Sequence, residues 1–372
     1  MRFIHMADIH LDTPFTVLGG KKDFANIRHL EQRQVFKEAI EYIQKEKIPF
    51  LFIAGDLYEQ KYIRESTIEY INNLFTEIPE TKIFIAPGNH DPFLNNSYYN
   101  NYNWNKNVTI FNQEVKTIEF EDVDIYGFGF SDFYCTDFDI NKIKIKNKEK
   151  INILIIHGSL DASKTLEMQY NPIKTNELKN IGFDYVALGH IHKANFENNE
   201  NNFIYPGSLI SFGFDELGEH GMLDVEINKN NSEKNNLNNK KIIKNNIKIN
   251  FIKLDNRIFE EKNINISEIN SEEELIEKIN EIKLEKNKFY KIILIGQKNI
   301  EINTSKLCKL IADKNILKIK DKTETKYNID KIATQNNLKG IFVKKMLEDI
   351  KDDKSNKEEI EQAIEIGLKA FE

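Results

Sequence analysis

Apolar runs alternate with amphipathic helical patterns in the first part of the chain, and this alternation constrains the fold more than any other feature. Residues 1–7, 49–56 and 82–89 contain continuous apolar stretches that read as buried strands. Between them, residues 26–47 and 63–78 carry apolar side chains at near-helical spacing. Strands buried on both faces and joined by helices are typical of a parallel sheet covered by helices. The sequence therefore predicts an α/β fold.

The pattern changes between residues 108 and 228, where strands outnumber helices. Five apolar segments stand out there: 123–130, 151–158, 183–190, 202–208 and 221–228. A second sheet packed on the first would explain them. We therefore expect a four-layer α/β/β/α sandwich, in which two sheets face each other and helices cover both outer faces.

The rest of the chain divides into three further parts, after a first domain that we place at residues 1–228. Residues 229–250 are rich in Asn and Lys, which predicts an exposed connection or a surface hairpin. Residues 251–328 have the pattern of a small α+β domain. Residues 329–372 are helical, with apolar stripes beside charge that suit packing on the body or on another protein.

Bulk properties exclude several classes of protein. The 372 residues carry a formal net charge of −7, so any nucleic-acid binding must use a local patch or a partner. Two cysteines far apart in sequence make neither a disulfide framework nor a thiolate cluster, and they fit a reducing cytosol. No apolar stretch approaches the roughly 20 residues that span a bilayer. We expect a cytoplasmic protein with no membrane partner.

Polar side chains that can bind metals follow the apolar strands, and they are the candidate site. Five of the eight histidines fall just past such strands. Because the carboxyl ends of parallel strands meet at one edge of a sheet, these residues should converge there. The candidates are Asp8, His10, Asp56, Asn89, His90, Asp91, His157, His190 and His192.

These residue types suit a pair of divalent first-row metal ions. Such ions bind imidazole nitrogens and hard oxygens and leave room for water and substrate. A carboxylate such as Asp56 can bridge two ions about 3.5–4 Å apart. Taken singly, a Gly-Asp pair after a strand is usually a turn, and a lone strand histidine is usually structural. All the motifs together, each at a strand end, indicate a two-metal site.

At this point the motifs resemble those of a known family. Asp8-x-His10, Gly55–Asp56, "GNHD" at 88–91, His157 and "GHIH" at 189–192 resemble the calcineurin-like metallophosphoesterase superfamily. Within it, "MRFIHMADIHLDTPF", "GDLY" and "YPGS" resemble the DNA repair exonucleases of the SbcD and YhaO type. The motifs cover about the first 225 residues. That branch also has a DNA-capping domain and an ATPase-binding end, which the last parts of this chain match in order and size.

The resemblance implies a role for each candidate residue. One metal ion would be held by Asp8, His10, Asp56 and His192, and a second by Asp56, Asn89, His157 and His190. His90 would face the scissile phosphate and protonate or stabilise the leaving oxygen, and Asp91 would lie beside it and orient the imidazole. The metal ions implied are manganese.

The function implied is a metal-dependent DNA nuclease, a 3′–5′ exonuclease that acts in DNA repair with a coiled-coil SbcC-type ATPase subunit. The helical tail would be the element that docks this partner, through a stripe formed by Phe342, Met346, Leu347 and Ile350. A homodimer is common in such families and stays open here.

One departure from the family pattern bears on activity. The nuclease branch often has a histidine three residues after the bridging aspartate, and this chain has Glu59. That change puts strong stand-alone exonuclease activity in question and favours the YhaO-like group.

Two other functions remain as alternatives. The first is a phosphatase or small-molecule phosphodiesterase of the same superfamily, although "GDLYEQ" lacks the Asp-Arg pair that follows the Gly-Asp motif in protein phosphatases. The second is a scaffold that has lost its metals, against which the complete ligand set argues.

Some polar and aromatic residues have two readings each. His5 lies inside the first strand, and we expect it to be packed or hydrogen-bonded. Arg28, Arg33 and Arg64 lie on or near helices, where ion pairs are the simpler role and contacts with DNA phosphates the alternative. The aromatic segment 98–104 could stack on bases or cover the core.

Overall fold

A computed structural model describes most of the chain, in two compact units, Met1–Glu260 and Glu261–Glu372. The described residues are 1–15, 22–135, 138–161, 170–197, 201–229, 241–244, 246–255, 257–311, 315–325, 327, 329–352 and 357–371. Residues 230–240 and 245 of the predicted Asn/Lys-rich connection lie outside them. The domain boundaries predicted at 228, 250 and 328 stay predictions.

The first unit is built on a seven-stranded sheet. Its order is β13 (Lys241–Lys244), β14 (Ile247–Lys253), β12 (Gly221–Ile227), β1 (Arg2–Met6), β2 (Phe50–Ile53), β3 (Lys82–Ile85) and β4 (Val108–Ile110). β1 to β4 are parallel, as the strand–helix alternation predicts. The assignment of segment 221–228 to the second sheet is wrong, because β12 pairs antiparallel with β1 and β14 pairs with β12.

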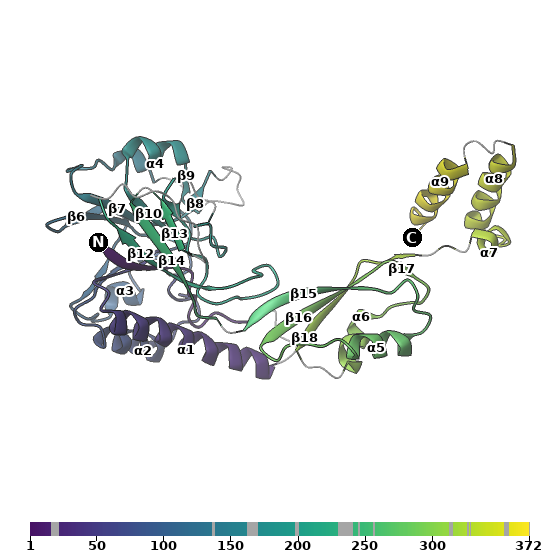
Figure 1. Cartoon of the computed structure of the whole chain (residues 1–372), viewed down its shortest axis with the longest axis horizontal. Coiled ribbons are helices and arrows are strands. Elements are labelled where there is room, and N and C mark those ends of the chain that lie inside the picture. The colour runs from purple at the N-terminus through teal and green to yellow at the C-terminus, as the bar shows by residue number, and fades with distance from the viewer. Residues whose placement is uncertain are drawn as a thin grey trace. The chain divides into compact units, whose positions relative to one another are not determined.

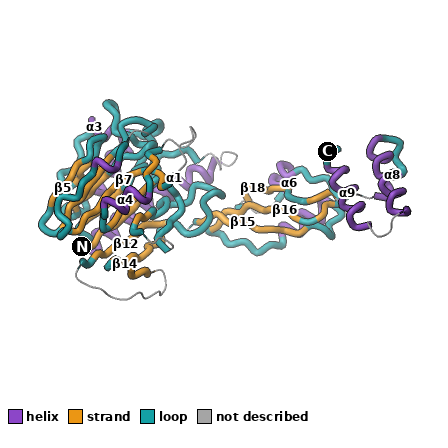
Figure 2. Tube along the Cα trace, turned by 90° about the horizontal axis from the view of Figure 1, so that it is seen from above, coloured by secondary structure: helices purple, strands orange, loops and turns teal. Residues whose placement is uncertain are grey.

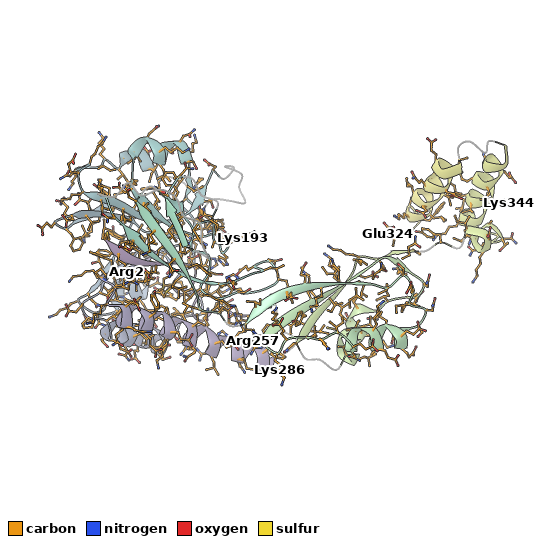
Figure 3. All side chains as sticks on the ribbon, in the orientation of Figure 1. Arg2, Lys193, Arg257, Lys286, Glu324 and Lys344 are labelled. Carbon is orange, nitrogen blue, oxygen red and sulfur yellow. The ribbon has the colours of Figure 1, made fainter. Side chains whose placement is uncertain are left out.

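A five-stranded sheet packs face to face on the first. Its order is β11 (Phe203–Ile204), β10 (Tyr185–Gly189), β7 (Ile151–His157), β6 (Val123–Phe128) and β5 (Lys116–Glu119). Aromatic and branched side chains of both sheets share one core, which includes Phe3, Phe52, Phe84, Ile125, Ile153 and Tyr185. Arg2 at the start of β1 (Figure 3) pairs with Asp224 of β12 at 2.7 Å and thereby supports the register of these strands.

Helices cover the two outer faces of this pair of sheets. α1 (Lys22–Glu46) and α2 (Glu65–Thr76) lie on the seven-stranded sheet, and α4 (Thr175–Ile181) lies on the five-stranded sheet (Figure 1). Leu178 of α4 belongs to the apolar cluster on the outer face of β7 and β10. The predicted four-layer α/β/β/α arrangement is therefore confirmed.

Short elements complete the first unit: α3 (Tyr98–Asn101), a 3₁₀ turn (Ile140–Lys142), β8 (Ser159–Leu160) and β9 (Pro172–Ile173). Two aromatic residues of the segment around α3 pack on core residues, which supports the expectation that the segment covers the core. The Trp104 ring lies 6.2 Å from the ring of Phe75, and buried Tyr99 lies 4.9 Å from Tyr58.

A three-stranded sheet with helices on it lies in the second unit, apart from the first three residues of β15. β15 (Ile258–Asn265), β16 (Lys288–Ile295) and β18 (Ile316–Asp321) lie side by side (Figure 2), with α5 (Glu272–Asn280) and α6 (Thr304–Leu310) between them in sequence. A two-stranded ribbon joins β17 (Gln297–Lys298) to β19 (Glu324–Thr325). Ser271 caps α5 by accepting a hydrogen bond from the Glu274 backbone amide at 3.2 Å.

The last helices are α7 (Ile329–Ala333), α8 (Leu338–Asp352) and α9 (Lys357–Lys369). Val343 of α8 and Ile364 and Leu368 of α9 are fully buried, so α8 and α9 share a small core of their own. Within the described ranges, no helix has the length and apolar character needed to cross a membrane.

Candidate metal centre

The polar residues after the strands adopt an unusual backbone conformation. Asp8, His10, Asp56 and His190 have φ angles of 52°, 50°, 54° and 104°. For residues with a side chain this left-handed region costs about 1–2 kcal/mol each, and such strain concentrates at functional sites. The loops are held together because the His10 amide donates to the Asp56 carbonyl at 2.8 Å.

Asp56, which is 1% exposed, lies at the middle of the site. Its Oδ2 atom is 3.3 Å from Nε2 of His157 and 3.6 Å from Nε2 of His10. Its Oδ1 atom accepts a hydrogen bond from the backbone amide of His90 at 2.9 Å. One carboxylate thus faces two groups of imidazoles, which suits a bridging ligand.

Asp8, His10 and His192 converge on one side of Asp56. The Nε2 atoms of His10 and His192 are 3.2 Å apart, and Nε2 of His192 is 3.9 Å from Oδ1 of Asp8. Asp8 also accepts hydrogen bonds from the His190 backbone amide, at 3.0 and 3.1 Å. Nitrogen ligands bind first-row ions at about 2.0–2.1 Å, so two of them on one ion can lie about 3 Å apart.

His157 and Asn89 converge on the other side. Nδ1 of His157 donates to the Ala54 carbonyl at 2.9 Å, which leaves Nε2 to face Asn89 Oδ1 at 3.0 Å and the carboxylate of Asp56. The His190 ring lies 5.2 Å from that of His157. Nε2 of His157, Oδ1 of Asn89 and Oδ2 of Asp56 can all accept a hydrogen bond and lie close together, so a cation or a proton is needed between them.

The convergence can be summarised by three overlapping groups whose potential ligand atoms lie within 4.8 Å of one another. They are Asp8 with His10 and His192, Asp8 with Asp56 and His157, and His10 with Asp56 and His90. Carboxylate oxygens and imidazole nitrogens in this number fit divalent first-row ions. Five of the seven predicted ligands belong to these groups, and the other two, Asn89 and His190, lie beside His157. Their assignment as ligands stays a prediction.

Two glycines permit this close approach. A Cβ atom on Gly55, whose φ is +90°, would collide with the His157 ring, and one on Gly88 would collide with Asp56. Glycine is therefore required at both turns for steric reasons.

Asp91 does not orient His90, and that part of the prediction is corrected. Its two oxygens accept from the backbone amides of Asp56, Leu57 and Gly88 at 2.7–3.0 Å and from the Tyr99 hydroxyl at 2.6 Å. These backbone donors lie on the two loops that carry Asp56 and Asn89. Asp91 is fully buried, and it fastens the two loops together.

Glu59 takes the place expected for Asp91. Its carboxylate lies 2.8 Å from Nδ1 of His10 and 2.9 Å from Nδ1 of His90. Burial alone would raise the pKa of Glu59, but hydrogen bonds from the two imidazoles lower it to about 2. Burial likewise opposes the charge on His90, but Glu59 and the charge of Asp56 leave its pKa raised.

Glu216 is a contact that the sequence did not predict. Its carboxylate accepts a hydrogen bond from Nδ1 of His192 at 2.6 Å. The surrounding segment, 211–221, contains three acidic residues, and nothing in the sequence pattern distinguishes Glu216 from the other two. Only the folded loop shows which of them reaches the site.

Buried charge dominates the electrostatics of the site. Burial lowers the pKa of His157 and His192, but Asp56 beside the first and Glu216 beside the second raise both to about 9. Burial, with the neighbouring imidazolium of His157, lowers the pKa of His190 to about 3. Without metal, protons on imidazoles therefore balance the carboxylates, and metal binding would release them.

Two of the three arginines form ion pairs within the protein. Arg28 is fully buried and pairs with Asp255 at 2.9 Å and Glu31 at 2.8 Å, and Arg33 pairs with Asp12 at 3.0 Å. Ion pairing is therefore confirmed for these two, whereas the Arg64 side chain is exposed.

A cavity of about 640 Å³ opens beside His192. Its lining includes His190, His192, Lys193, Ser208, Phe214 and Leu217. Lys193 is labelled in Figure 3, on the first unit. Two of the candidate ligands, His190 and His192, thus line an open cavity, as a site with an external substrate requires.

Three curated proteins have sequences similar to this chain. The chain is 26% identical over 246 residues to the protein named "Uncharacterized metallophosphoesterase YhaO" of Bacillus subtilis, an alignment covering 61% of this chain and 57% of that protein. It is 27% identical over 265 residues to a protein of Staphylococcus epidermidis that is named as the SbcD subunit of nuclease SbcCD, covering 62% and 67%. A protein of the same name from Staphylococcus saprophyticus is 26% identical over 261 residues, covering 61% and 66%. The chain thus spans about three fifths to two thirds of the length of these relatives.

A family model also matches the first half of the chain. The model described as "Calcineurin-like phosphoesterase" matches residues 1–194, which is just over half of the 372 residues. The matched segment contains every strand end that supplies a candidate ligand. The chain therefore belongs to the calcineurin-like phosphoesterase family.

Proposed function

We propose that this protein is a metal-dependent DNA nuclease that hydrolyses phosphodiesters at a two-metal site, as a 3′–5′ exonuclease. The observation that carries the proposal is the set of three ligand groups that share Asp8, His10 and Asp56. Shared ligands of this kind suit two neighbouring ions more than one structural ion.

The ligands divide into two sets around Asp56. Asp8, His10 and His192 with Asp56 would hold one ion, and Asn89, His157 and His190 with Asp56 would hold the other. Nitrogen and oxygen donors on both sides suit divalent first-row ions, and the resemblance to the family points to manganese among them. The bound ions would supply Lewis acidity, activating the attacking water and neutralising charge on the phosphoryl oxygens.

His90 is the acid of the reaction. Its side chain is 44% exposed, unlike the buried ligands beside it, so a phosphate can reach it. Glu59 accepts from Nδ1, which leaves Nε2 available to the substrate. The raised pKa of His90 favours the protonated ring, which can give a proton to the departing 3′ oxygen. General acid catalysis of this kind contributes about 10²–10⁴-fold to the rate.

A partner ATPase is part of the proposal. Two of the relatives are named as the SbcD subunit of nuclease SbcCD, and this name describes one component of a complex. Leu338 and Ile341 of α8 and Ile366 of α9 are 63–74% exposed, and an apolar surface of this kind suits docking to a coiled-coil SbcC-type ATPase. The net charge of −7 fits a nuclease that gains DNA affinity from such a partner. A role in DNA repair, a cytoplasmic location and a homodimer belong to the same proposal.

The test is degradation of end-labelled DNA by the purified chain with manganese, alongside a generic phosphomonoester and phosphodiester. The His90→Ala variant runs in parallel, with manganese binding measured for both proteins. We expect the wild type to shorten the DNA from its 3′ ends. We expect His90→Ala to bind manganese and to lose at least about a hundredfold in rate.

Other results would select the alternatives. Turnover of the small phosphoesters with intact DNA, even with a candidate ATPase present, would make the protein a phosphatase or small-molecule phosphodiesterase. A wild type that binds no divalent ion would be a scaffold.

A further inference from the structure

We propose that Glu216 is a positioning residue of the metal centre, which holds His192 with its Nε2 atom facing Nε2 of His10. The inference rests on the metal site of the proposed function. It concerns one of the two ions only, the one assigned to Asp8, His10, Asp56 and His192.

Glu216 is itself held firmly. One carboxylate oxygen accepts from Nδ1 of His192 at 2.6 Å. The other accepts from the Ser208 hydroxyl at 3.1 Å and from the backbone amide of Phe212 at 3.2 Å. The side chain of Glu216 is 16% exposed, so these contacts are largely removed from water. Three donors on one carboxylate fix its position before any ion binds.

The consequence for the two imidazoles is directional. A carboxylate can only accept, so Nδ1 of His192 donates to Glu216 and Nδ1 of His10 donates to Glu59. Each ring is left with Nε2 toward the centre, where the two Nε2 atoms lie 3.2 Å apart. Metal-bound histidines are commonly fixed in this way by a carboxylate on the second nitrogen.

An aromatic side chain protects this arrangement. The Phe212 ring lies 5.4 Å from the His10 ring and 5.6 Å from the His192 ring, and Phe15 stacks on it at 5.8 Å. The same residue, Phe212, gives its backbone amide to Glu216. The loop that carries Phe212 and Glu216 therefore both orients and covers the imidazoles.

Glu216 allows a cleaner test than Glu59. Glu59 also contacts His90, so a change there affects the proposed acid as well as the ligand. The described contacts of Glu216 reach only one predicted ligand, His192. Loss of the Glu216 carboxylate should therefore weaken the binding of one ion and leave the affinity for the other ion unchanged.

The experiment is calorimetric titration of manganese chloride into the metal-free full chain, with Glu216→Gln and Glu219→Gln compared with wild type. In Glu216→Gln one carboxylate oxygen is replaced by an NH2 group, which can only donate. This group must face either Nδ1 of His192 or the backbone amide of Phe212, which are both donors, so the contacts of the carboxylate cannot all be kept. Glu219 is on the same loop and pairs with Lys253 at 3.5 Å. We expect two binding events in wild type and in Glu219→Gln. In Glu216→Gln we expect one event about 10–100-fold weaker and the other unchanged.

A second readout separates positioning from general damage. Cobalt(II) replaces manganese, and its visible d–d absorption reports the geometry of the bound ions. We expect Glu216→Gln to change the spectrum of one cobalt ion and to leave that of the other ion as in wild type. Unchanged affinity for both ions, or an equal loss at both, would overturn the role of Glu216.

The two proposals fail differently. A wild type that binds two manganese ions but leaves DNA intact would overturn the nuclease and keep Glu216. Equal manganese binding by wild type and Glu216→Gln would overturn the role of Glu216 and keep the nuclease. Absence of manganese binding by wild type would overturn both.

Discussion

Asp91 shows how one buried side chain can organise a site without touching a substrate. Its carboxylate accepts from three backbone amides and one tyrosine hydroxyl. Two of those amides, on Asp56 and Leu57, belong to the loop after β2, and the third, on Gly88, belongs to the loop after β3. Each buried amide would cost about 1–3 kcal/mol if left without an acceptor. The separation between Asp56 and Asn89 therefore depends on Asp91.

His5 gives a prediction for the pH dependence of stability. It is fully buried, and it contacts the Tyr185 hydroxyl at 2.9 Å and the Leu188 carbonyl at 3.2 Å, which confirms the structural reading. Burial lowers the pKa of His5 to about 3, against the contact with the Leu188 carbonyl. Between pH 3 and the unfolded value near 6.5, the unfolded chain binds the extra proton, so stability falls as the pH falls through this window.

The variant His5→Leu removes the imidazole that binds this extra proton in the unfolded chain. We expect the free-energy difference between wild type and His5→Leu to shift against wild type by up to about 1.4 kcal/mol per pH unit below about pH 6. Urea unfolding followed by fluorescence of Trp104, the single tryptophan, measures it at several pH values. A difference that stays constant from about pH 7 to about pH 4.5 would contradict the assignment.

The sequence identified the ligand candidates because local rules govern them. Asp8, Asp56 and His157 follow or end buried strands, and parallel strands bring their ends together. The contacts of Glu59 and Glu216 obey no such rule. They depend on loop geometry and on side chains 24 to 49 residues distant in sequence.

At the scale of elements, the periodicity of apolar residues predicted where helices and strands lie better than it predicted which strands pair. The helix expected over 63–78 is observed as Glu65–Thr76, and the strand expected over 49–56 is observed as Phe50–Ile53. The apolar content of segment 221–228 showed a strand but could not show which sheet it joins. That choice depends on β12 returning beside β1, a pairing across more than 200 residues.

The stripe on α8 illustrates the same ambiguity. Phe342, Met346 and Leu347 are partly buried against the shared core of α8 and α9, and the expectation that they form a docking face stays a prediction. The side chain of Ile350, the fourth member of the stripe, lies outside the described side chains. An amphipathic pattern indicates that a face is covered, and it does not say by which element.

The turn after β2 supports a prediction about close packing. Gly55 has a φ of +90°, and a Cβ atom there would meet the His157 ring. Gly182, at the end of α4, has a similar φ of +85° with nothing within 4 Å of an added Cβ atom. Alanine at either position carries the left-handed strain of about 1–2 kcal/mol, and only Gly55→Ala adds about 1–3 kcal/mol of overpacking.

We expect Gly55→Ala to lower the unfolding midpoint more than Gly182→Ala and to weaken manganese binding by displacing His157. Gly182→Ala should keep wild-type manganese affinity. Thermal unfolding and manganese titration of the two variants measure both effects. Equal losses in the two variants would mean that backbone strain alone matters at Gly55.

At the scale of the whole molecule, the apolar clusters are separate. One cluster lies between the two sheets, a second under α4, a third in the small sheet of the second unit, and a fourth between α8 and α9. The candidate ligands all belong to the first unit. A change confined to α8 should therefore leave the metal centre intact, which allows partner docking and metal binding to be tested independently.

The exposed apolar surface of α8 gives the corresponding prediction. Leu338 and Ile341 are 74% and 63% exposed and lie three residues apart, so they share one face of the helix. We expect the double variant Leu338→Glu, Ile341→Glu to lose co-purification with an SbcC-type ATPase, because two buried charges oppose an apolar interface. Lys142→Glu, an exposed change on the first unit that alters the net charge by the same amount, is the control and should retain the partner. Both proteins should bind manganese like wild type. Recovery of the ATPase with the double variant at the wild-type level would show that this face of α8 is not the docking surface.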